Sequence, residues 1–294
     1  MKTVLLGASP RVYPRPQYSS FGTAVVKLLT TTVRWPLYAA LFSFVVGPSY
    51  FLLHTWFFTF AAPYWDALAH LIPEYVLLDD LFFTFGLSLS VSIVYILENG
   101  FFYILDTFSL LQEYKLPRKP SQEPSDVLVK STLQKEFVAH TVTAPLLMLF
   151  VVSPLIRVIN KQAASPEHFP SFQIMWYTML VCHVVNEIMF YYGHRLLHTQ
   201  LLYKWIHKKH HSYVGTRSFA AEYAHEIEDV FTAYIPFLTG IFLTRAHFYM
   251  VFMWFFCQLT ETYESHSGYC FNGAFLQRMG FTYHHHAAYH GNTL

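Results

Sequence analysis

Residues 172–211 read FQIMWYTMLVCHVVNEIMFYYGHRLLHTQLLYKWIHKKHH. The part up to Tyr192 is mostly apolar, contains no Lys or Arg, and is as long as the roughly 20 residues that a membrane-spanning helix needs. The part after it contains an HxxxH followed by an HxxHH, formed by His194 and His198 and then by His207, His210 and His211. An apolar span that ends in grouped imidazoles predicts a metal site at a membrane surface.

The composition of the whole chain agrees with a membrane protein. The 294 residues are 54% hydrophobic, and only 13% are charged, whereas soluble domains have about 25% charged residues. The net charge of +1 provides no basic surface for nucleic acid, so no nucleic-acid partner is expected. The three cysteines include no CxxC pair, which argues against a disulfide scaffold or a thiolate zinc site.

Hydropathy predicts four membrane spans, at about 35–62, 81–105, 138–156 and 172–192. The arm 1–34 and the loop between the second and third spans are basic, whereas the loop between the first two spans has four acidic residues and no Lys or Arg. Basic loops stay in the cytoplasm, so the chain is expected to leave its fourth span on the cytoplasmic side near Gly193. The alternative is a soluble protein with a large buried helical core.

A fifth apolar region, 230–259, is interrupted by Arg245 and His247, and each half is short for a full span. We expect a helical hairpin with these two residues at its tip, because a third histidine group lies at 284–286 and must return to the same side. The predicted fold is therefore an all-α integral membrane domain, 35–294, with about four transmembrane helices and a hairpin. Its histidine-rich part, 194–294, forms a cytoplasmic helical cap that holds two metal ions.

The first two histidine groups cannot share a site on one straight helix. At 100° per residue, His194 and His198 face the side opposite to the second group. A break at Thr199–Gln200 is therefore expected, with two helices converging on the metal. Eight or more imidazoles exceed the needs of one zinc ion, so a two-metal site is the simpler interpretation. Interfacial histidines or a weak adventitious metal tract remain the alternative.

Further motifs accompany these groups: Tyr103–Asp106, Tyr114-Lys115-Leu116-Pro117, Glu222-Tyr223-Ala224-His225 and His266-Ser267-Gly268-Tyr269. In this combination, the chain resembles the fatty acid hydroxylase/sterol desaturase superfamily. The EYAH and HSGY segments are most similar to those of C4-methylsterol oxidases.

The resemblance implies a nonheme diiron oxidoreductase in the endoplasmic reticulum membrane, with its active site in the cytoplasm. Such an enzyme oxidises a C–H bond of a sterol or fatty acyl lipid with O₂, and it takes electrons from NAD(P)H through a reductase and cytochrome b5. The expected metal ligands are His194, His198, His207, His210, His211, His225, His266, His284, His285 and His286.

The third histidine group departs from the family pattern, which is HxxHH with an asparagine six residues later. Counting back from Asn292 puts Thr282 where the first histidine is expected, with His284 or His290 as a possible substitute. Because of Thr282 and the end at Leu294, two alternatives stay open: the chain is a catalytically inactive membrane scaffold, or the sequence is truncated. A fatty acyl hydroxylase and a sterol desaturase remain alternatives, and a metal transporter is disfavoured because its ligands would lie at mid-span.

Carboxylates are expected behind the histidines, and the candidates are Glu187, Glu222, Glu261 and Glu264. His183, inside the fourth span, is interpreted as a packing residue or as a residue behind the ligands. His140 is interpreted as an ordinary histidine at a span end.

Overall fold

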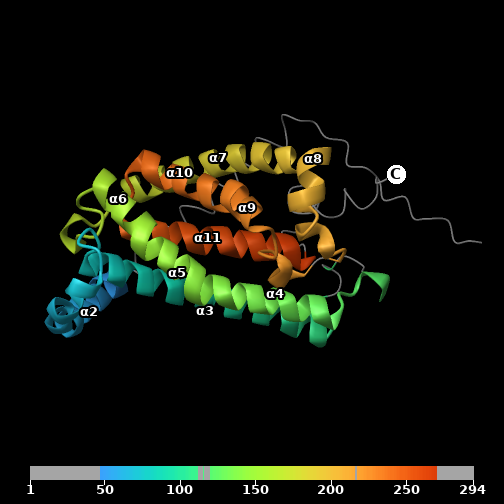
Figure 1. The fold of residues 1–294 in the computed structure, drawn as a ribbon, viewed down its shortest axis with the longest axis horizontal. Helices are drawn as coiled ribbons and strands as arrows, with labels where there is room; N and C mark the ends of the chain where they lie inside the picture. Colours follow the sequence, from blue (N-terminus) through green and yellow to red (C-terminus); the bar gives the residue numbers. More distant parts are fainter. Residues whose placement is uncertain (1–46, 112–114, 116–119, 216, 270–294) are drawn as a thin grey trace, which may run out of the picture.

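The computed structural model describes residues 47–111, 115, 120–215 and 217–269. Within these ranges every regular element is a helix, and the long helices run along one axis of an elongated bundle (Figure 1). The predicted all-α membrane fold is confirmed. The predicted arm 1–34, residues 35–46 of the first predicted span and the third histidine group lie outside the described residues.

The bundle begins with α2 (Gly47–Leu68) and α3 (Leu78–Thr107). A continuous rod follows, formed by α4 (Asp126–Val138), a π-helical turn (Ala139–Thr143), α5 (Ala144–Leu147), a second π-helical turn (Met148–Val152) and α6 (Ser153–Ile159). The remaining helices are α7 (Phe172–Leu197), α8 (Gln200–Leu202), α9 (Glu226–Glu228), α10 (Ile235–Thr244) and α11 (Phe248–Ser267). Two further π-helical turns follow α8 over Tyr203–His207 and join α9 to α10 over Asp229–Tyr234.

In the part of the chain that the structure describes, four continuous helices are long and apolar enough to cross a membrane: Leu78–Thr107, Asp126–Ile159, Phe172–Leu197 and Glu226–Thr244. The first three contain the second, third and fourth predicted spans. The fourth is the first arm of the hairpin. Helix α2 overlaps the first predicted span, which begins outside the described residues.

Prolines explain the π-helical turns inside the long helices. Pro145, Pro154 and Pro236 each stand two residues after such a turn. A proline ring collides with the carbonyl four residues before it, and that carbonyl lies inside the widened turn in every case. The sequence therefore sets where the helices widen and where side chains change register.

The predicted hairpin is present, with its tip at the expected residues. Helix α10 ends at Arg245, whose φ of 51° is left-handed, and the ring of His247 caps α11 by accepting the backbone N–H of Tyr249 at 3.1 Å. Helix α10 packs along α7 and α11 packs along α3. The hairpin therefore returns the chain to the end of the bundle where α7 ends (Figure 1).

The α7–α10 contact is a close approach of two backbones. A Cβ added to Gly240 would lie 2.6 Å from the Cα of Cys182, so only glycine fits there. On the outside, many large apolar side chains are exposed, among them Phe85 and Ile96 on α3 and Phe137 on α4. Exposed apolar side chains on helices of this length are expected of a surface that contacts lipid.

Candidate metal centre

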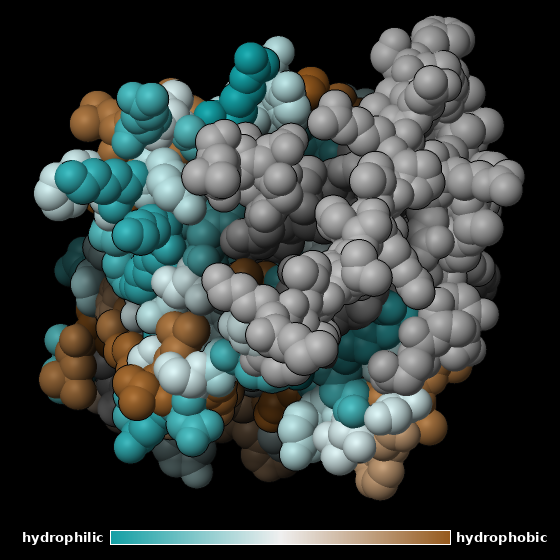
Figure 2. Space-filling view, turned by 90° about the vertical axis from the view of Figure 1, so that its right-hand side faces the viewer, coloured by the Kyte–Doolittle hydropathy of each residue, from teal (hydrophilic) through white to brown (hydrophobic). Residues whose placement is uncertain are grey.

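The first two histidine groups lie at one end of the bundle, where α7 ends, α8 follows and α11 terminates (Figure 1). Figure 2 looks onto this end, and many of the described residues visible there are hydrophilic. A polar end on an apolar bundle is the arrangement expected for a site at a membrane surface.

Four imidazoles point their Nε2 atoms toward one another. The Nε2 atom of His198 lies 2.9 Å from that of His194 and 3.0 Å from that of His207. The Nε2 atom of His211 lies 2.9 Å from that of His207. His194, His198 and His207 each offer a ring nitrogen within 4.8 Å of the other two. The structure thus brings both histidine groups to one place.

The backbone reaches this geometry through the predicted break. Helix α7 ends at Leu197, and α8 begins at Gln200 after an extended Thr199. The second group departs from the predicted α-helical face, because His207 ends a π-helical turn while His210 and His211 open a short 3₁₀ helix. The two groups nevertheless converge, since the break lets the second segment fold back over the first.

A buried carboxylate that the sequence did not single out holds His207. The Oε1 atom of Glu228 accepts a hydrogen bond from Nδ1 of His207 at 2.8 Å, and the two side chains are 5% and 0% exposed. Because Nδ1 carries the proton, the lone pair at Nε2 faces the other rings. This is the carboxylate–histidine arrangement that orients metal ligands in proteins.

The donor set fits a metal ion. Burial, with a smaller contribution from His207, lowers the pKa of His198 to about 4, so its ring is neutral at pH 7. Nitrogens bound at about 2.1 Å to one tetrahedral ion lie roughly 3.4 Å apart, close to the spacing of these rings. Neutral, converging imidazoles suit zinc, copper, iron or nickel.

The other predicted ligands lie beside this cluster or outside the described part. The His210 ring centroid is 5.4 Å from that of His266, whose pKa is lowered by burial. The Nδ1 atom of His225 accepts the backbone N–H of Ile227 and so caps α9. His284, His285 and His286 lie outside the described residues.

Among the described residues, the Glu222 carboxylate contacts side chains that are not predicted ligands. It accepts hydrogen bonds from Nε2 of His140 at 3.0 Å and from the hydroxyl of Tyr263. The interpretation of His140 as an ordinary span-end histidine is therefore wrong, because its ring belongs to a polar cluster with Glu222 and Glu136. His183 is buried with its ring 6.5 Å from that of Trp254, in agreement with a packing role.

The remaining sequence motifs meet at Asp106. Its carboxylate pairs with Lys115, lies 3.1 Å from Nη1 of Arg217 and accepts the hydroxyl of Tyr269 at 2.9 Å. These contacts join segments that are far apart in the chain, next to the end of α11. The motifs that contain Asp106, Lys115 and Tyr269 therefore have a structural role.

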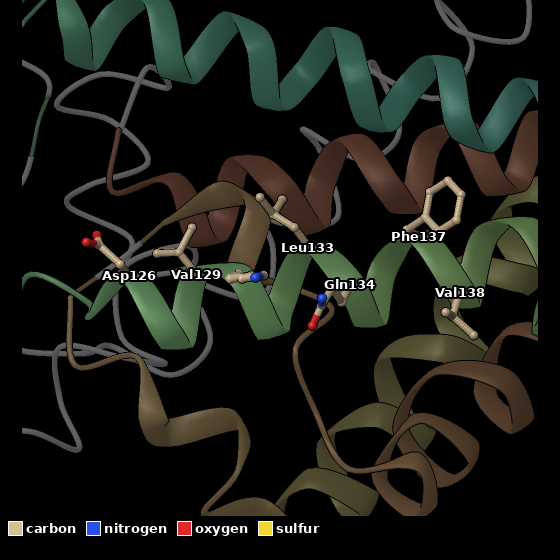
Figure 3. A pocket seen from close by; sticks show the side chains of 7 residues that line it. Asp126, Val129, Leu133, Gln134, Phe137 and Val138 are labelled. Carbon is tan, nitrogen blue, oxygen red and sulfur yellow. The ribbon is translucent and has the colours of Figure 1, made fainter.

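A shallow groove of about 650 Å³ runs along one side of α4, lined by residues from Asp126 to Val138 (Figure 3). None of the clustered histidines lines it. The groove belongs to the apolar outer face of the rod and does not enter the candidate centre.

The fold and the cluster define a multi-span helical membrane protein with a histidine-rich site suited to a metal. In a comparison with known families, residues 179–293 match the model of the fatty acid hydroxylase family. The resemblance expected from the motifs is thus confirmed, and it points to oxidoreductases of the hydroxylase and monooxygenase class.

Similar proteins give the particular resemblance. A putative methylsterol monooxygenase of Dictyostelium discoideum is 29% identical over 212 residues, which are 72% of this chain and 74% of the relative. A very-long-chain aldehyde decarbonylase of Oryza sativa is 28% identical and covers 69% of this chain and 79% of the relative. Methylsterol monooxygenase 1 of Gallus gallus is 39% identical over 98 residues, about a third of each chain. No solved structure matches the chain significantly.

Proposed function

We propose that this chain is an iron-dependent monooxygenase that uses O₂ to oxidise a C–H bond of a sterol, with a C4-methylsterol as the substrate. The observation that carries the proposal is the converging Nε2 set of His194, His198, His207 and His211, with Glu228 behind it. The methylsterol monooxygenases among the relatives support the substrate class.

The ten histidines named from the sequence are proposed to hold two iron ions, with His225 and His266 beside the central cluster and the third group completing it. Bound iron would supply the activation of O₂ that oxidation of an unactivated C–H bond requires. The chain's own residues keep the His198 ring neutral, fix the proton of His207 on Nδ1 and exclude water from the buried rings.

The cellular setting is also a proposal. Lys204, Lys208 and Lys209 lie beside the histidines, whereas the opposite end carries Glu74 and Asp79. Basic residues stay in the cytoplasm, so the histidine end would face the cytoplasm from the endoplasmic reticulum membrane. There it could take electrons from NAD(P)H through cytochrome b5 and its reductase.

The test uses the full chain, purified in detergent and loaded with Fe²⁺, with a 4-methylsterol and a reductase system. We expect O₂ uptake coupled to product, about two irons per chain, and a loss of turnover beyond about 100-fold in His207→Ala. His168→Ala is the matched control, because His168 is exposed and far along the chain from the cluster. Zinc as the sole bound metal, with no turnover after iron loading, would refute the proposal.

A second candidate is a fatty acyl hydroxylase or desaturase, favoured by the fatty acid hydroxylase domain and by a fatty acid hydroxylase of Mycosarcoma maydis among the relatives. Sterol profiles separate the two, since cells lacking the chain accumulate a 4-methylsterol only under the first proposal. A catalytically inactive scaffold would bind lipid in the same assay but would consume no O₂.

A further inference from the structure

A second polar cluster lies inside the bundle, separate from the converging histidines. Glu136 and His140 stand four residues apart on the Asp126–Ile159 rod, and Glu222 comes from the segment before α9. Each of the three offers one ligand atom within 4.8 Å of the other two. The Nε2 atom of His140 lies 3.0 Å from Oε2 of Glu222.

Two buried polar atoms near this cluster have no hydrogen-bond partner among the described residues. One is Oε1 of Glu136, a side chain that is only 2% exposed. The other is the hydroxyl of Tyr95, whose ring lies 5.0 Å from that of His140 and 5.8 Å from that of Tyr263. A buried carboxylate oxygen without a partner is costly, so each such atom calls for a ligand.

The nearby ammonium group does not neutralise the two carboxyls. Nζ of Lys135 contacts the backbone carbonyls of Glu222 and Ala224, each at 2.9 Å, and Oδ2 of Asp229 at 3.0 Å. These three acceptors use its three protons. A single proton shared by the carboxyls would leave both Oε1 of Glu136 and the Tyr95 hydroxyl unsatisfied.

We propose that Glu136, His140 and Glu222 form a separate binding site for one first-row divalent cation such as Mn²⁺ or Fe²⁺. Two carboxylate oxygens and one imidazole nitrogen are a donor set that such ions accept. The ion balances the buried negative charge and occupies the space toward which Oε1 of Glu136 faces. The Tyr263 hydroxyl, which donates to Glu222, orients that carboxylate from behind.

The site ties three helices and the segment before α9 together at the end of the bundle that carries the histidines. Tyr95 lies on α3, Glu136 and His140 lie on the rod, and Tyr263 lies on α11, one helical turn before His266. The ion thus has a structural position beside the candidate centre, and its binding does not depend on the proposed oxidation.

The experiment measures Mn²⁺ binding to the purified full chain by loss of the free-ion signal in electron paramagnetic resonance. The double variant His198→Ala/His207→Ala removes the histidine cluster, and we expect it to retain about one Mn²⁺ per chain. Adding Glu136→Gln should weaken this binding at least tenfold, whereas adding the exposed Glu167→Gln should not change it.

A second measurement keeps the test valid if the double variant does not fold. In the otherwise unchanged chain, Glu136→Gln and His140→Gln should each lower the total metal content by one ion, and Glu167→Gln should not. Unchanged metal content in both cluster variants would overturn the proposal and would leave a shared proton as the account of the cluster. A failure of the proposed monooxygenase function is seen separately, because the unmodified chain would then form no product in the 4-methylsterol assay.

Discussion

The buried pair of Glu228 and His207 leads to a sharp prediction about metal affinity. Glu228→Gln keeps the size of the side chain but removes its charge. If the amide oxygen faces Nδ1, His207 keeps its tautomer beside a weaker acceptor. If the amide nitrogen faces Nδ1, the ring proton moves to Nε2, the atom that faces the other imidazoles. Water cannot replace the carboxylate, since the side chains are only 5% and 0% exposed.

We expect the affinity of the histidine cluster for Zn²⁺ or Fe²⁺ to fall by roughly 10- to 100-fold, or about 1.4–2.8 kcal/mol. Competition with a chelator in detergent measures the affinity directly. Glu167→Gln is the matched control, since Glu167 is exposed and lies far along the chain from the histidines. Equal affinities for the two variants would refute the role given to Glu228.

Two further predictions concern stability. Gly240→Ala forces α7 and α10 apart and should lower the unfolding free energy by about 1–3 kcal/mol, measured by thermal unfolding in detergent. Gly100→Ala is the control, because a Cβ at Gly100 meets nothing within 4 Å, and it should be neutral or stabilising in the same assay. Burial lowers the pKa of His247 to about 4, so the unfolded chain binds the extra proton as the pH falls from about 6.5 to 4. The free energy of unfolding should therefore drop by up to about 3 kcal/mol across that window. The variant His247→Asn can still cap α11 but does not titrate, so it should flatten this dependence of stability on pH. The same pH dependence in the variant as in the unmodified chain would contradict this explanation.

Much of the bundle follows from local sequence patterns. Long apolar runs indicated the helices, Arg245 and His247 marked the hairpin tip, and the facing angles of the histidines required the break at Thr199. Each of these features depends on residues close together in the chain. The second, third and fourth spans expected from hydropathy lie within long apolar helices of the described residues, and the first hairpin arm is also long and apolar enough to cross a membrane.

The carboxylates behind the rings could not be assigned from the sequence. Glu228 lies 21 residues after His207, and Glu222 lies 82 residues after His140, so only the packed helices bring them together. The π-helical turns before Pro145 and Pro236 also shift the register that a regular helix would give. The place of Glu228 in the first turn of the apolar helix Glu226–Thr244 was a local signal for a buried carboxylate.

The position of Glu228 at the start of the hairpin also has a consequence for biosynthesis. The ribosome makes His194 to His211 before the hairpin, but the carboxylate that fixes His207 arrives with the first hairpin arm. Tyr263, which braces Glu222, arrives only near the end of α11. A nascent chain that has inserted α7 alone therefore carries the imidazoles without their orienting partners. We expect metal capture to wait for α10 and α11, so that a chain stalled before them stays recognisable to quality control as unfinished.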